Sequence, residues 1–148
     1  MVKRERLPAD IRARLPRIAE HLRHDPYVVA VYLFGSFARG EEDALSDIDL
    51  GVLLQPRLTR AERGRLELDL IRTIMHLLGT EEVSFVLLND APLTLRYEVV
   101  RRGRILIDND TAMRLDFEVH TEDLYMDFKP MLDAYDEALL EQLTAPRA

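Results

Sequence analysis

The chain has 148 residues, a net charge of −7 and no cysteine. That length suits one domain with its own core, so we expect residues 1–148 to form a single domain. The acidic charge argues against general nucleic-acid binding, and the absence of cysteine excludes a disulfide framework. No apolar run approaches the length of a membrane span, and the N-terminus lacks a signal peptide, so we expect a cytoplasmic protein.

Hydrophobic periodicity and turn residues predict alternating helices and strands. In chain order these are a helix over 8–24 that Pro16 kinks or splits, a strand over 27–34, a short helix from Ser36, a strand over 47–54, a helix over 59–78, a strand over 82–88, a helix over 92–102, a strand over 104–107 and a helical region over 111–143. This order suits an α+β fold, a mixed sheet of about four strands with helices mainly on one face. The core spans about 8–108.

Two of the predicted helices carry an apolar stripe. The helix over 59–78 opens with a capping-box pattern and ends before Gly79, and its expected buried residues are Leu66, Leu70, Ile74 and Leu77. In the last helix the stripe comprises Phe117, Leu124, Phe128, Leu132, Tyr135 and Leu139. We expect Pro130 to kink this helix and Phe128 to pack in the core or at a dimer seam.

The candidate site lies between two apolar runs. Gly35 permits a sharp turn and the close approach of a ligand, and Ser36 can begin a short helix whose free N–H groups point at an anion. Asp47 and Asp49 open the next strand, where residues two apart share a face and lie roughly 6–7 Å from each other. Their repulsion is on the order of 2–3 kcal/mol, which predicts a divalent cation, and Mg²⁺ suits carboxylates and phosphates.

The spacing of these residues is similar to a known signature. Gly35-Ser36, ten residues, then Asp47-x-Asp49 resembles the DNA polymerase beta-type nucleotidyltransferase superfamily. The fuller strings over 35–40 and 46–50 resemble its minimal nucleotidyltransferase (MNT) branch, many members of which are antitoxins to HEPN-domain toxins. Further strings over 88–92, 96–99 and 125–128 resemble the carboxy-terminal half of those antitoxins.

The resemblance implies a role for each residue of the site. Asp47 and Asp49 are expected to be catalytic and to bind Mg²⁺ in a two-metal site. The nucleotide, ATP or another NTP, is expected to contact Gly35, Ser36 and Arg39. For Ser36 the alternative is a plain helix cap, and for Arg39 it is a surface ion pair with Glu41 or Glu42.

The chain departs from the superfamily pattern at one position. Active members usually place a third carboxylate on the neighbouring strand, where it binds metal and accepts the proton of the attacking hydroxyl. That position is Ser84 here, and serine cannot replace a carboxylate in either role. Either the protein has little activity and retains nucleotide binding, or Glu82, on the same face of the strand, is the catalytic substitute.

Three functions are compatible with this pattern. The first is transfer of AMP, or another NMP, from an NTP to a hydroxyl, with a tyrosine of a cognate HEPN toxin, a ribonuclease, as the acceptor implied by the resemblance. The second is a nucleotide-binding antitoxin that acts by contact alone. The third is a nucleotidyltransferase for small molecules such as aminoglycosides. The first two functions predict a protein partner. Both a homo-oligomer and a hetero-oligomer are compatible with the sequence.

Overall fold

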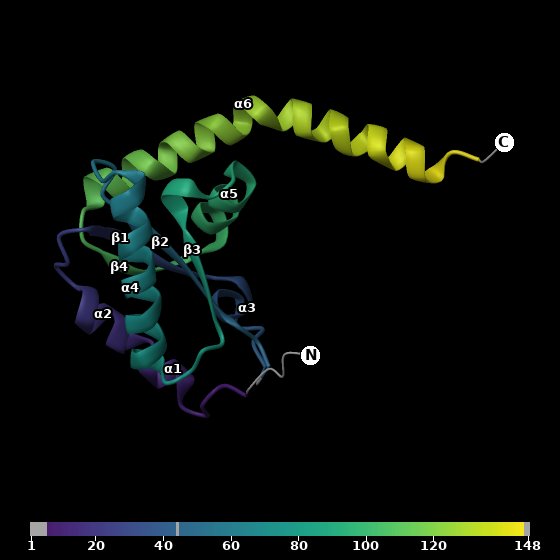
Figure 1. Ribbon diagram of the computed structural model, residues 1–148. Coiled ribbons are helices and arrows are strands. Elements are labelled where there is room, and N and C mark those ends of the chain that lie inside the picture. Colours follow the sequence, from purple (N-terminus) through teal and green to yellow (C-terminus); the bar gives the residue numbers. More distant parts are fainter. Residues whose placement is uncertain (1–5, 44, 147–148) are drawn as a thin grey trace.

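The computed structural model describes residues 6–43 and 45–146. Residues 1–5, which belong to the segment expected to lack a signal peptide, lie outside the described residues. Its centre is a four-stranded mixed sheet in the order β3-β2-β1-β4 (Figure 1). The strands are β1 (Val28–Phe34), β2 (Ile48–Leu54), β3 (Val83–Leu87) and β4 (Arg104–Asp108). β1 runs antiparallel to both β2 and β4, whereas β2 and β3 are parallel. The predicted mixed α+β sheet is therefore confirmed.

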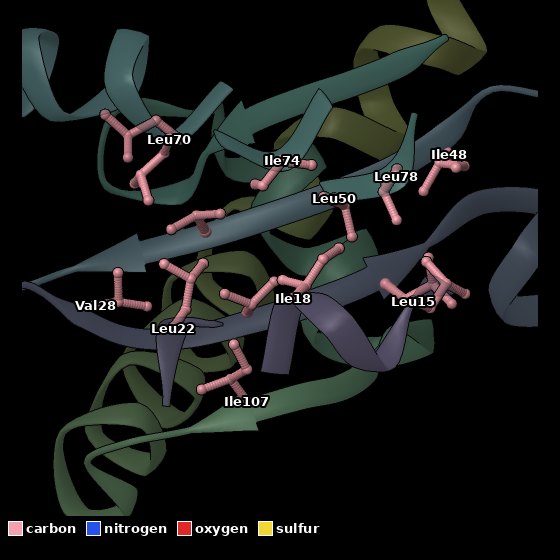
Figure 2. Close-up of a cluster of buried hydrophobic side chains, with 14 of the residues drawn as sticks. Leu15, Ile18, Leu22, Val28, Ile48, Leu50, Leu70, Ile74, Leu78 and Ile107 are labelled. Atoms are coloured by element: carbon pink, nitrogen blue, oxygen red, sulfur yellow. The ribbon is translucent and has the colours of Figure 1, made fainter. Parts of the chain in front are cut away.

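The larger core lies between one face of the sheet and three helices, α1 (Ile11–Arg14), α2 (Pro16–Leu22) and α4 (Arg60–Leu78). Figure 2 shows Ile18 of α2, Leu50 of β2 and Ile74 of α4 gathered in this layer. All three are fully or almost fully buried. Pro16 splits the predicted first helix, because proline occupies the first helical position of α2 without a free N–H to satisfy.

The opposite face of the sheet is also covered, so the helices are divided between the faces more evenly than expected. Here α5 (Leu93–Arg102), the 3₁₀ turn η1 (Leu88–Asp90) and the start of α6 (Thr111–Thr144) pack on the sheet. Gly51 makes room for them, since a Cβ there would lie 3.3 Å from side-chain atoms of both Leu88 and Val99. This close packing depends on long-range contacts and so escapes a periodicity argument.

Helix α4 begins and ends as its sequence predicts. Thr59 and Glu62 form both hydrogen bonds of a capping box, and Gly79 closes the helix in the left-handed conformation. Of the predicted stripe, Leu70 and Ile74 are buried and Leu66 is half-buried, whereas Leu78 is buried in place of Leu77.

Helix α6 differs from the other helices in length and setting. It runs for 34 residues and continues through Pro130, with the Asp110 carboxylate accepting a hydrogen bond from the Met113 N–H at its start. Its first half packs beside α5 and β1, and Figure 1 shows its second half extending away from the rest of the chain. Within the described residues, no helix has both the length and the apolar character needed to cross a membrane.

Candidate active site

The turn at Gly35 lies in direct contact with a carboxylate. β1 ends at Phe34, and the chain turns at Gly35, φ +69°, into the short helix α3 (Gly35–Arg39). A Cβ at Gly35 would lie 2.0 Å from Oδ2 of Asp49. Both the positive φ and this contact require glycine, because any side chain would displace the carboxylate. The predicted sharp turn is therefore present, and the group that approaches Gly35 closely is the Asp49 carboxylate.

The two aspartates stand at the start of β2. Asp49 pairs in register with Phe34 of β1, while Ile48 between the aspartates points into the core and is fully buried. Asp47 immediately precedes the strand and is close enough to raise the pKa of Asp49. Alternation along the strand thus brings the two carboxylates together beside the Gly35 turn.

The pKa of Asp49 is raised above its ordinary value of 3.8. Burial contributes most, the charge of Asp47 comes second, and a hydrogen bond from Ser84 and the charge of Arg39 partly offset them. Ionising Asp49 in the free protein therefore costs more than ionising an ordinary aspartate. A divalent cation beside the pair would reverse this balance, so the two carboxylates fit a metal such as Mg²⁺.

Ser84 is the register partner of Asp49 across the parallel β2–β3 pair. The structure therefore brings Ser84 to the neighbouring-strand position beside the aspartates, the position that the superfamily resemblance implies. Glu82 lies one step nearer Asp47, and its carbonyl accepts a hydrogen bond of 3.0 Å from the Ile48 N–H. Over residues 6–43 and 45–146, no three His, Cys, Asp or Glu side chains group as a metal site.

Arg39 lies at the end of α3, and its surroundings agree in part with both roles considered from the sequence, a surface ion pair and a contact with the nucleotide. Its Nε donates a hydrogen bond of 2.9 Å to Glu41, which is the surface ion pair. Its charge also acts on Asp49 and on Glu98 of α5, so the guanidinium is near the site as well. Ser36 lies in the first turn of α3, and its carbonyl accepts the Glu41 N–H at 2.9 Å.

The sequence analysis did not identify Arg12, which connects α3 and the residue Glu42 to α1. Arg12 of α1 forms an ion pair with Glu42, donates a 3.1 Å hydrogen bond to the Phe37 carbonyl and stacks its guanidinium over the Phe37 ring, 5.3 Å from the centroid. These contacts join segments 25 to 30 residues apart, and the sequence signal for them is the large apolar Phe37 in a turn whose other residues are small or polar.

Comparison with known proteins gives the class to which this fold and site belong. Residues 17–112 match the family model described as polymerase beta, nucleotidyltransferase. That match covers more than half of the chain, which therefore belongs to the polymerase beta nucleotidyltransferase family. No curated protein matches the chain.

Solved structures narrow the resemblance to MNT antitoxins of HEPN toxins. The chain is 26% identical to a chain of a toxin–antitoxin crystal structure with AMP-PNP, with a TM-score of 0.62 over 90% of this chain and 98% of that one. It is 25% identical, with a TM-score of 0.61, to a chain of the tri-AMPylated Shewanella oneidensis HEPN toxin in complex with MNT antitoxin, over 91% and 99%. The MntA–HepT toxin–antitoxin gives 25% and 0.60, over 90% and 99%.

Proposed function

We propose that this protein is a Mg²⁺-dependent nucleotidyltransferase that transfers AMP, or another NMP, to a tyrosine of a cognate HEPN toxin and thereby acts as its antitoxin. The observation that carries the proposal is the contact between the Gly35 turn and Asp49, with Asp47 beside it. The solved relatives with AMP-PNP and with an AMPylated HEPN toxin support both the nucleotide and the acceptor. Such a pair would act in the cytoplasm.

Asp47 and Asp49 would hold Mg²⁺, in a two-metal site. The metal would neutralise phosphate charge and favour the ionised form of the attacking oxygen. The turn of Gly35 and Ser36 would present backbone N–H groups to the leaving pyrophosphate, and Arg39 would move from Glu41 to a phosphate in a fork geometry.

The transfer itself is a displacement at the α-phosphorus. The tyrosine oxygen forms a bond to that phosphorus, the bond to the bridging oxygen of the β-phosphate breaks, and pyrophosphate leaves. The tyrosine proton needs an acceptor. Ser84 cannot be that acceptor, because it carries no carboxylate. We therefore assign the role to Glu82, whose side chain must lean along the strand toward Asp49 to reach the tyrosine proton.

A second candidate function is neutralisation of the toxin by contact alone. Ser84 favours it, because a serine leaves the neighbouring-strand position without a carboxylate. In that case the aspartates and the Gly35 turn would bind nucleotide without transferring it.

The deciding measurement is transfer of label from α-labelled ATP to the purified toxin, with Mg²⁺ and with EDTA. We expect label on the toxin for the wild type and a loss of at least about 100-fold for Asp47→Asn and Asp49→Asn, since each removes a metal ligand. Glu82→Gln tests the base, and Glu81→Gln, its sequence neighbour, is the matched control. Small hydroxylated acceptors are assayed in parallel.

Each outcome separates the candidates. Label on the toxin that is lost in all three variants supports the transferase with Glu82 as base. If the wild type binds ATP and inhibits the toxin but never labels it, the transferase is overturned and neutralisation by contact alone is favoured. Label only on small molecules overturns the toxin as acceptor.

A further inference from the structure

Exposed apolar side chains are concentrated on α6. In the described part of the chain, nine of the thirteen large apolar side chains that are exposed lie on this helix. Most of these lie beyond Tyr125, in residues 126–144, which we call the arm. They are Met126, Phe128, Met131, Tyr135, Leu139, Leu140 and Leu143. The arm thus bears an apolar surface that the rest of the chain leaves in water.

The exposed surface continues the buried face of the same helix. At about 100° per residue, Phe117 and Thr121 in the packed half lie on one line with Tyr135 and Leu139 in the arm. Phe117 packs in the core beneath α5 and Thr121 is fully buried, whereas Tyr135 is 68% exposed. The pattern typical of a covered helix therefore extends beyond the part that the chain itself covers.

The packed half of α6 is held by ion pairs, a hydrogen bond and an aromatic stack, so the arm continues from an anchored start. Arg114 bridges Asp108 and Glu118 at 2.9 Å each, and Glu118 also accepts a 2.7 Å hydrogen bond from the buried Tyr32 hydroxyl. At the end of the packed half, Tyr125 stacks on Tyr97 with the ring centroids 3.6 Å apart. A surface presented this way needs little ordering when a partner binds.

The arm is strongly acidic beside its apolar stripe. It carries five acidic side chains and a single lysine, and Lys129 pairs with Asp133 of the arm itself at 2.7 Å. We propose that the arm docks into an apolar groove bordered by basic side chains on the toxin. This inference rests on the proposed function, which supplies the toxin as the partner, and the acidic side chains of the arm favour a basic surface on that partner.

Charge decides between the toxin and a second copy of this chain. Two arms packed against each other would bring like charges together along their edges, which is unfavourable, and the whole chain carries −7. A basic partner gains from the same charges, most of all in the rate at which it associates.

The test uses two adjacent leucines of the full-length protein. Leu139 lies on the stripe, whereas Leu140 points about 100° away from it, and both are exposed, so neither change should unfold the protein. We expect Leu139→Glu to weaken binding of the purified toxin by at least about tenfold and Leu140→Glu by less than about threefold. Affinities come from calorimetry, and ATP binding by each variant is measured beside them.

The possible results distinguish this inference from the proposed function. Loss of toxin binding by Leu139→Glu alone, with ATP binding intact, supports docking on the arm. Equal toxin binding by both variants and the wild type overturns it and leaves the proposed function standing. A wild type that binds no toxin overturns both. Concentration-dependent dimers that Leu139→Glu dissociates would assign the stripe to a second copy and also overturn the inference.

Discussion

Around Gly35 the protein draws carboxylates into a half-buried setting, whereas on the arm it holds apolar side chains in water. Both arrangements are unfavourable in the free chain: burial and the charge of Asp47 raise the pKa of Asp49, and Leu143 is 75% exposed. The two regions differ in the ligand that would offset the cost, a cation with phosphates in one and a protein groove in the other. Features that work against the stability of the isolated molecule thus indicate where it binds.

Gly35→Ala tests the contact on which the site depends, and we expect it to have the largest effect. The new Cβ would collide with Asp49 and also strain a residue at φ +69°. Gly40→Ala is the matched control, since Gly40 has the same φ and, among the described residues, no atom lies within 4 Å of a Cβ placed there. Each variant should lose about 1–2 kcal/mol of unfolding free energy from strain, measured by urea titration. Only Gly35→Ala should also lose transfer, by at least about 100-fold; equal activities would contradict the role of the contact.

Ser84→Asp tests whether the missing carboxylate limits the chemistry. The new side chain would stand beside Asp49 across the β2–β3 pair, within reach of a metal and of the attacking hydroxyl. We expect transfer to rise by about tenfold or more, because a well-placed base contributes about 10² to 10⁴. Without Mg²⁺ the variant should melt below the wild type, since three carboxylates repel. Ser84→Asn controls for size, and an unchanged rate in both variants would show that the serine is not limiting.

Tyr32→Phe sharpens the other side of the comparison, by testing the base of the arm. The Tyr32 ring is 1% exposed, and burial and Glu118 raise the pKa of its hydroxyl. Removing the hydroxyl should cost about 1–2 kcal/mol of unfolding free energy in urea, because Glu118 loses a buried donor. Tyr135→Phe on the exposed stripe is the matched control and should leave stability unchanged. Equal effects of the two changes would mean that the Tyr32 hydrogen bond adds nothing.

Asp49→Asn should have the smallest effect on the ligand-free protein, and a favourable one. The pKa of Asp49 is raised on folding, so its ionisation destabilises the folded state above the ordinary value of 3.8. The variant should therefore melt slightly above the wild type at pH 7, and the difference should vanish as the pH falls toward 3.8. Mg²⁺ with ATP should raise the melting temperature of the wild type alone. A variant that melts below the wild type at pH 7 would contradict the raised pKa.

The sequence predicted well those features that are set by neighbours in the chain. The Gly35 turn, the alternation that brings Asp47 and Asp49 together, and the caps of α4 all follow from residues a few positions apart. The contacts of Arg12 with α3 could not be predicted, because they join α1 to a turn that comes near it only when the sheet has formed.

Periodicity showed which face of α6 is apolar, but not what covers it. Phe128 was expected in the core or at a dimer seam, and the structure leaves it 44% exposed, outside the packed half of the helix. A stripe has the same spacing whether it meets its own sheet, a second copy or another protein. The roles of Asp47, Asp49, Glu82 and the nucleotide-binding residues stay predictions for the labelling assay.

The 34 residues of α6 also form a helix about 50 Å long. A toxin docked on the arm would be held at a distance set by the length of this helix, and a tyrosine of that toxin within reach of the site would meet it at a millimolar effective concentration. The site then needs no deep acceptor pocket, because residence comes from the arm. Selectivity among tyrosines would follow from reach more than from the residues that surround each hydroxyl.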